Sequence, residues 1–255
     1  TALRAKIAEL GAERVAAFYA EPIQGSGGVL VPPAGWMKAM HVVCKEHDIL
    51  FVADEVITGF GRTGPLFACS EDDIVPDFLT VAKGMTSGYV PMGAVFMSDR
   101  VYNAIADGAG STPVGHGQTY SAHPVSAAVG LACLDLYENG LLDNGRKAGA
   151  RLLEGLHSLS DHPLVGDVRG RGLLQAVELV EHRDAKTPFP PERRIGAAIK
   201  KEAMAAGLMV YPGAGTIDGV SGDHVLLAPP YNVDAETIDL IVDKLGLAVD
   251  SVLSR

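Results

Sequence analysis

Three short apolar runs in the first third of the chain each end in one ionisable residue. Residues 15–20 lead into Glu21, residues 49–53 into Asp54, and residues 78–82 into Lys83. Runs of this length that are apolar on both faces predict buried strands of a parallel sheet. Ligands of such sheets bind beyond the carboxyl ends of the strands, so we expect two carboxylates and one amine to meet there.

Helical periodicity lies between and after these runs. Apolar positions on one face predict a helix that opens after Pro33 and ends near residues 47–48. The chain thus begins with a strand, a helix and a strand, which is the unit of a doubly wound α/β sheet. A further apolar run covers residues 93–97, and a helix is expected from His123 to a stop at residues 138–140.

The pattern changes near residue 145. Helices are predicted at residues 145–159, 192–206 and 235–253, and short strands at residues 174–180, 208–210 and 225–228. Because this stretch has its own strands and helices, we predict a smaller α/β domain over residues 145–255. Residues 1–144 then belong to a different, larger domain.

Composition narrows the classes of function. The chain has 255 residues, 47% of them hydrophobic, and a formal charge of -10 from 31 acidic and 21 basic residues. The acidic balance and the lack of a basic cluster argue against nucleic acid and anionic membrane as partners. No apolar run is as long as a membrane span, so we expect a cytoplasmic protein. The cysteines are far apart and the histidines show no ligand spacing, which predicts neither disulfides nor a metal site.

An amine and a carboxylate at neighbouring strand ends suit one cofactor in particular. Pyridoxal phosphate (PLP) needs an amine for its aldehyde and an anion beside its ring nitrogen. Lys83 and Asp54 supply that pair. Taken alone, each is better interpreted as a surface charge at a strand end, but this interpretation weakens when they are taken together. Gly59, Gly61 and Gly64 match the G-x-G-x-x-G pattern, but no strand directly precedes them and no long helix follows. They predict a tight loop rather than a dinucleotide site.

Four longer motifs lie in order along the chain. They are AEPIQGSGG at residues 20–28, DEVITGFGRTG at residues 54–64, TVAKG at residues 80–84 and HGQTYSAHP at residues 116–124. Together they resemble the signature regions of class III, fold type I, PLP-dependent aminotransferases, and the resemblance covers essentially the whole chain. It implies that residues 1–144 are the carboxyl-terminal part of the doubly wound, PLP-binding large domain. Residues 145–255 are then the small carboxyl-terminal domain.

The resemblance implies roles for five residues. Lys83 would form a Schiff base with PLP and then carry a proton, and Asp54 would keep the ring nitrogen protonated. Val56 would pack on one face of the ring, and Glu21 would lie near the ring's hydrogen-bonding groups. Thr119 would bind the cofactor phosphate of the neighbouring subunit, which implies a homodimer with shared active sites.

Two departures from the family bear on the amino acceptor. Ser26 stands where relatives that use glutamate often carry a glutamate that gates an arginine, and a small residue there is more similar to ω-amine and β-alanine:pyruvate transaminases. No arginine lies between Leu208 and His224, where many such enzymes carry one for the carboxylate of the keto acid. How the carboxylate of the acceptor is held is therefore open. From Ser26 we expect transfer of an amino group from a primary amine or ω-amino acid to a keto acid, with pyruvate as the acceptor.

Family members also have an amino-terminal portion, which carries a phosphate-binding cup and an aromatic residue that stacks on the cofactor. Residue 1 lies after that portion, so we expect this polypeptide alone not to form a stable, active monomer. Besides a second copy of the chain, a separate amino-terminal polypeptide is therefore a candidate partner. The alternatives are an aminomutase or a glutamate-dependent transaminase of the same fold, and a catalytically silent fragment that acts as a binding or assembly module.

Overall fold

The computed structural model describes residues 2–108 and 116–253, and it groups the chain into two compact units. The first unit holds residues 1–22, 32–60 and 65–139, and the second holds residues 23–31, 61–64 and 140–255. Two short early segments therefore belong to the second unit. The domain boundary at residue 144 stays a prediction.

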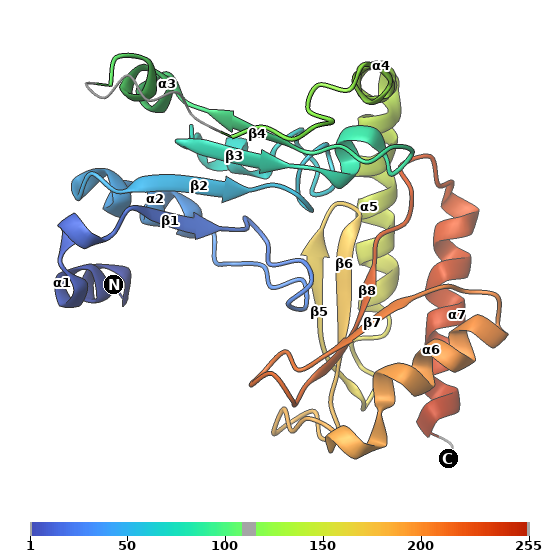
Figure 1. Cartoon of the computed structure of the whole chain (residues 1–255). Coiled ribbons are helices and arrows are strands. Elements are labelled where there is room, and N and C mark those ends of the chain that lie inside the picture. Colours follow the sequence, from blue (N-terminus) through green and yellow to red (C-terminus); the bar gives the residue numbers. More distant parts are fainter. Residues whose placement is uncertain (1, 109–115, 254–255) are drawn as a thin grey trace. The chain divides into compact units, whose positions relative to one another are not determined.

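The first unit is built on a four-stranded sheet in the order β1-β2-β3-β4 (Figure 1). Its strands are β1 (Ala17–Ala20), β2 (Leu50–Asp54), β3 (Phe78–Val81) and β4 (Ala94–Met97). β1, β2 and β3 run parallel, and β4 is antiparallel to β3. The three expected strands are thus confirmed, with small shifts at their ends, and so is the α/β class.

Of the strands in this sheet, β2 is the one that is deeply buried. Phe51 and Ala53 are both 0% exposed, because β2 lies between two strands and α2 (Trp36–Glu46) packs on it. By contrast, Tyr19 on β1 is 58% exposed, and β3 is half-buried over most of its length. The expectation that all three apolar runs are buried is therefore wrong for β1, which in the described chain has a neighbouring strand on one side only.

The helices of the first unit are α1 (Ala2–Leu10), α2, α3 (Asp99–Ala106) and α4 (Pro124–Leu136). The pattern predicted α2 and α4 but not α1 or α3. α1 contacts α2 and buries one side chain, Ile7. α3 likewise buries one, Val101, so neither helix carries a broad apolar face. The amphipathic pattern of α1 is weak, whereas that of α3 is present in the sequence but spans only eight residues.

The stop expected at residues 138–140 is not where the helix ends. A widened turn of π-helix, Tyr137–Leu141, joins α4 directly to α5 (Leu142–His157). Gly140 has φ +102°, so the widened turn accommodates the conformation that would otherwise end the helix. By length and composition alone, Pro124–His157 is apolar enough to cross a membrane, and core helices of soluble proteins meet the same criterion. The absence of a membrane partner stays a prediction.

The second unit contains a four-stranded antiparallel sheet in the order β5-β6-β8-β7 (Figure 1). Its elements are β5 (Val165–Arg171), β6 (Leu174–Leu179), β7 (Tyr211–Ala214), β8 (Asp223–Leu227), α5, α6 (Ile195–Ala205) and α7 (Ala235–Leu253). The strand expected at residues 208–210 is wrong, because Leu208 still donates a backbone hydrogen bond to Ala203 of the preceding helix. The strand begins at Tyr211, and it includes Pro212, which an edge strand tolerates.

The two faces of this sheet differ in chemistry. One face carries Val177, Val225 and Leu227, all buried, toward α5, α6 and α7. Strand alternation places Glu178 and His224, which pair across β6 and β8, on the opposite face. That opposite face therefore includes a polar pair, and its histidine is only 1% exposed.

Candidate functional site

The register of the parallel strands places their carboxyl ends at one edge of the sheet in the first unit. Ala20 pairs with Ala53, and Asp54 pairs with Thr80. Glu21 directly follows β1, Asp54 is the last residue of β2, and Lys83 comes two residues after β3. The three ionisable residues thus belong to the edge at which ligands of parallel sheets bind.

Asp54 is held by two hydrogen-bond donors. Its Oδ1 accepts from the backbone N–H of Val56 and from the hydroxyl of Thr80, each at 3.1 Å. Since the Thr80 hydroxyl donates to Asp54, it accepts from the hydroxyl of Tyr19, also 3.1 Å away. A chain of polar groups therefore runs across all three parallel strands and ends on one oxygen of the Asp54 carboxylate, which is half-buried.

Lys83 opens a short 3-10 turn, Lys83–Thr86, with an exposed side chain and φ +40°. Positive φ is uncommon for a residue with a side chain and persists where the surroundings impose it. Here the hydroxyl of Tyr137 donates a 2.5 Å hydrogen bond to the carbonyl of Gly84 and contacts the Ser87 hydroxyl at 2.8 Å. A Cβ at Gly84 would lie 2.9 Å from Phe60, so the turn is closely packed.

Glu55 is a structural member of this region that the sequence analysis missed. Its side chain is 0% exposed. The carboxylate accepts hydrogen bonds from the Thr58 hydroxyl at 2.5 Å and from the backbone N–H of Cys69 at 2.7 Å. These bonds fix the loop that leaves β2 and carries Val56. Burial, together with the nearby Glu55 charge, raises the pKa of Cys69 to about 12, so this thiol is unreactive at neutral pH.

Thr119 and Glu21 are placed less tightly than Asp54. Thr119 is exposed in a turn that is closed by a 2.9 Å backbone hydrogen bond from Ser121 to Gln118, just before α4. Glu21 is half-buried and takes part in a polar interaction. The described contacts do not join Thr119 to Asp54 or Lys83, so its link to the site stays a prediction.

The glycine-rich loop of residues 59–64 turns tightly, as predicted. Gly61 and Gly64 adopt φ +87° and +120°, which favour glycine. Arg62, inside the second unit, donates hydrogen bonds to the carbonyls of Pro229 at 2.8 Å and Leu173 at 3.2 Å. Its guanidinium also stacks 4.5 Å from the centre of the Tyr231 ring. The loop is thereby anchored through an arginine.

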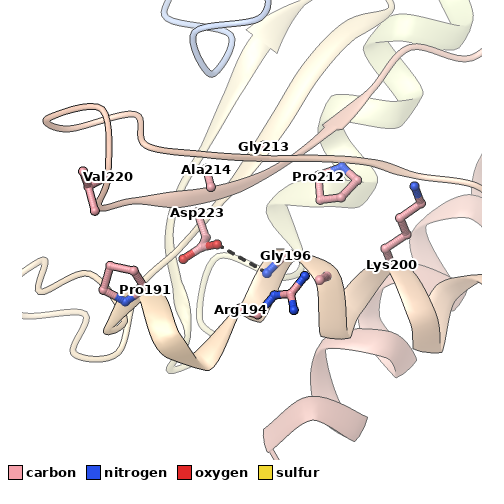
Figure 2. A pocket seen from close by; sticks show the side chains of 10 residues that line it. Pro191, Arg194, Gly196, Lys200, Pro212, Gly213, Ala214, Val220 and Asp223 are labelled. Atoms are coloured by element: carbon pink, nitrogen blue, oxygen red, sulfur yellow. Dashed lines mark hydrogen bonds between the residues drawn. The ribbon is translucent and has the colours of Figure 1, made fainter.

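The second unit also contains an open cavity of about 390 Å³ between the start of α6 and strands β7 and β8 (Figure 2). Arg194 and Lys200 bring positive charge to its lining. Asp223 brings a carboxylate, which accepts a 3.3 Å hydrogen bond from the backbone N–H of Gly196, and burial raises the pKa of Asp223. The site residues predicted from the sequence are not in this lining. Within the described part of the chain, no group of three or more His, Cys, Asp or Glu side chains is placed to hold a metal ion.

Comparison with known proteins gives one consistent family. A family model of class-III aminotransferases matches residues 2–249. Gamma aminobutyrate transaminase 3, chloroplastic, of Solanum lycopersicum is 40% identical over 247 residues, which are 96% of this chain and 46% of that protein. The chain spans about half the length of the curated relatives that it matches.

Solved structures agree with the family. An (S)-enantioselective omega-transaminase from Thermomicrobium roseum has a TM-score of 0.90 at 40% identity, covering 98% of this chain and 54% of that one. An amine transaminase from an uncultivated Pseudomonas species, solved in its PLP-bound form, has a TM-score of 0.91 at 40% identity, covering 98% and 55%. At this level of identity, the likeness extends from the fold to the family.

Proposed function

We propose, because the chain belongs to the class III aminotransferase family, that the protein containing it transfers an amino group from a primary amine or ω-amino acid to a keto acid. The observation that carries this proposal is the arrangement at the sheet edge. A lysine with an exposed amine follows β3, and an aspartate braced by two donors ends the adjacent β2. This is a donor set for PLP, the cofactor with which a solved relative was crystallised.

The residues at the edge fit the cofactor chemically. Bound PLP would act as an electron sink for negative charge that develops on the substrate carbon. Lys83 would supply the amine that tethers the cofactor, and its Nζ would then accept and return the proton of the substrate carbon. Asp54 would hold a proton on the ring nitrogen. Both described hydrogen bonds to Asp54 are accepted by Oδ1. We therefore propose that Oδ2 is the oxygen that would face the ring nitrogen of the cofactor.

Three further residues have proposed supporting roles. Val56 donates its backbone N–H to Asp54 and would present an apolar surface to one ring face. Glu21 would contact the ring's polar groups from the end of β1. Thr119 would bind the cofactor phosphate in the partner subunit of a homodimer, for which its exposed position before α4 is suitable.

The acceptor is proposed to be pyruvate, and the amine donor to be a primary amine or ω-amino acid. Ser26 is exposed and uncharged, so it supplies no gating carboxylate of the kind that glutamate-using relatives carry. The tomato relative named above is a gamma aminobutyrate transaminase, which is in line with an ω-amino donor. We propose a cytoplasmic location on the basis of composition, whereas named relatives include chloroplastic and mitochondrial proteins.

The proposal is tested with the Lys83→Ala variant of the complete protein. The wild type should show the visible absorbance of a lysine-bound cofactor, lose it on borohydride reduction, and transaminate. Lys83→Ala should lose both the absorbance and turnover, because one amine serves as tether and proton carrier. Lys200→Ala, on the unrelated α6, is the matched control and should keep both. Near wild-type turnover in Lys83→Ala would refute the assignment.

A further inference from the structure

Residues 23–31 form a compact loop in the second unit. Backbone hydrogen bonds of 3.0 and 3.2 Å join Gln24 and Leu30 and close its neck. Ile23 and Val29 anchor it, with exposures of 1% and 0%. At the tip, by contrast, Ser26 is exposed. The loop is thus an ordered support whose tip presents Ser26 outward, and it follows Glu21 in the chain with one residue between.

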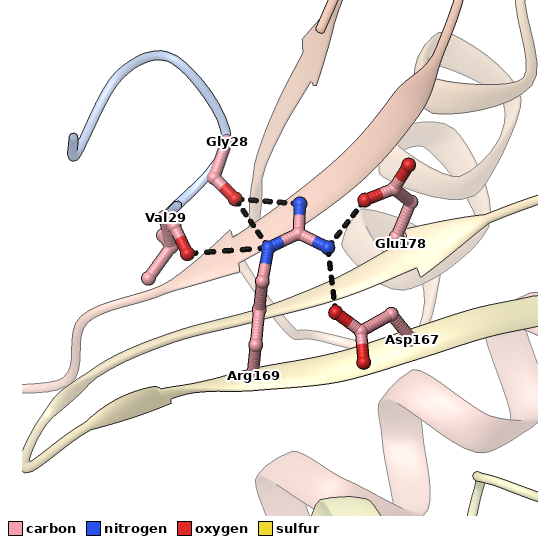
Figure 3. Close-up of polar contacts among 5 residues, drawn as sticks. All are labelled: Gly28, Val29, Asp167, Arg169 and Glu178. Carbon is pink, nitrogen blue, oxygen red and sulfur yellow. Dashed lines mark hydrogen bonds and ion pairs between the residues drawn. The ribbon is translucent and has the colours of Figure 1, made fainter. Parts of the chain in front are cut away.

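Arg169 of β5 holds the base of this loop through its backbone (Figure 3). Its Nε donates to the carbonyls of Gly28 at 2.9 Å and Val29 at 3.2 Å, and its Nη2 donates to Gly28 at 2.7 Å. On the other side of the guanidinium, Nη1 donates to Asp167 at 3.0 Å and to Glu178. The Arg169 side chain is only 13% exposed, so nearly all its hydrogen-bonding capacity is spent inside the fold.

This arrangement requires an arginine and a glycine at the two contact points. A guanidinium presents several N–H groups in a fixed plane, and it can face two carbonyls and two carboxylates at once, whereas an ammonium group cannot. Gly28 has φ +118°, and a Cβ there would lie 2.8 Å from Thr216 and 3.3 Å from Nη2 of Arg169. The fit between Arg169 and the loop is therefore a closely matched contact rather than a surface ion pair.

We propose that Arg169, oriented by Glu178, is a positioning residue for the loop of residues 23–31 and thereby for Ser26. This inference rests on the proposed function, in which the small, uncharged Ser26 favours pyruvate as the amino acceptor. Loss of the contact frees the carbonyls of Gly28 and Val29, so the loop opens at its base and Ser26 no longer has one position. The amine-donor half of the reaction, which depends on Lys83 and Asp54, is left unchanged.

The test uses Arg169→Met and Arg169→Lys in the complete protein, with Arg151→Met as the matched control. Arg151 makes an equally well-formed pair with Asp239, at 2.7 and 2.6 Å, but on the exposed surface of α5 and α7. Hydrogen exchange followed by mass spectrometry reports on the loop. Both Arg169 variants should speed exchange at residues 24–30 at least about tenfold, with β6 and β8 unchanged, and Arg151→Met should leave residues 24–30 protected.

Kinetic constants distinguish a role in acceptor binding from a purely structural role of Arg169, because a purely structural role would not change KM for pyruvate selectively. In the Arg169 variants, KM for pyruvate should rise about fivefold or more, while the single-turnover rate with the amine donor changes less than about twofold. Glu178→Gln should also speed exchange at residues 24–30 and raise KM for pyruvate, each to a smaller extent. This variant replaces Arg169→Met in the test if Arg169→Met does not fold. Unchanged exchange at residues 24–30 would overturn the contact, whatever the activity. Faster exchange with unchanged KM would overturn the role in acceptor selection, as would a wild type that fails to transaminate.

Discussion

The hydroxyl of Thr80 on β3 donates a hydrogen bond to Oδ1 of Asp54 at the end of β2, over 3.1 Å. The two residues are register partners in a parallel pair of strands, so the bond follows from the sheet itself. Tyr19 on β1 extends it through a 3.1 Å contact with the same hydroxyl. The position of the proposed ring-nitrogen partner is thus set by strand pairing rather than by a flexible loop.

Thr80→Val should weaken catalysis without removing the cofactor. Valine keeps the shape of threonine but cannot donate to Asp54, so the carboxylate keeps only the Val56 N–H as a described donor. We expect the amine-donor half-reaction to slow by roughly tenfold, about 1.4 kcal/mol, measured by single-turnover absorbance. Thr80→Ser retains the hydroxyl and is the control. Equal rates in Thr80→Val and wild type would show that Asp54 does not depend on this bond.

Asp54→Asn should leave cofactor bound but poorly active. An amide cannot hold the proton on the ring nitrogen as a carboxylate does, so the electron sink is lost. The same half-reaction should slow by about two orders of magnitude, while the visible absorbance of the bound cofactor persists. If the rate is unaltered, Asp54 is a structural charge at the end of β2.

The acceptor preference should favour pyruvate over 2-oxoglutarate. With Ser26 in place of a glutamate that gates an arginine, the second carboxylate of 2-oxoglutarate would be poorly paired, and an unpaired buried charge is costly. Specificity constants for the two keto acids should therefore differ by about tenfold or more. Ser26→Ala removes no charge and should retain the preference. A higher value for 2-oxoglutarate would contradict the proposed acceptor.

Acid should destabilise the second unit through His224. The pKa of His224 lies below its ordinary value because burial disfavours the charged ring and Arg169 repels it, which outweighs the pull of Glu178 and Asp223. A base whose pKa is lowered by folding gives stability that is present above its unfolded value of 6.5 and lost as the pH falls below it. The melting temperature should therefore drop between pH 7.5 and 5.5.

The His224→Gln variant isolates this effect. It should reduce the slope of the free energy of unfolding against pH by up to about 1.4 kcal/mol per pH unit over that range. The pKa of His41 in the first unit is also lowered by burial, so some acid sensitivity should remain. A slope identical in His224→Gln and wild type would contradict the prediction.

The sequence predicted the elements that carry the site because their signals are local. A run such as residues 49–53 is apolar throughout, and its length and its terminal Asp54 suffice to place a strand and a polar end. The helix break at Gly140 was wrong because a widened turn inside a continuous helix absorbs a conformation that usually ends one. The strand at residues 208–210 was wrong because apolar character alone does not set register, which Tyr211 pairing with Leu226 fixes.

Other members of the site depend on contacts that no local pattern shows. Thr80 is one polar residue inside an apolar strand, which was a usable signal once its partner strand was known. Glu55 directly follows Asp54 and reads as a second surface charge, yet it is fully buried by its bonds to Thr58 and Cys69. Arg169 meets Gly28 across a sequence separation of 141 residues, and pairing over that distance leaves no periodicity.

That separation also orders events during synthesis. The loop of residues 23–31 leaves the ribosome long before β5. Its Gly28 and Val29 carbonyls therefore lack their hydrogen bonds from Arg169 until β5 has been synthesised. At common elongation rates, Arg169 is added roughly 7 to 28 s after Gly28, which precedes it by 141 positions. During that interval Ile23 and Val29, which end up fully shielded, remain open to non-native contacts. The second unit can therefore complete its fold only after β5 has been synthesised, although one of its segments is made near the start of the chain.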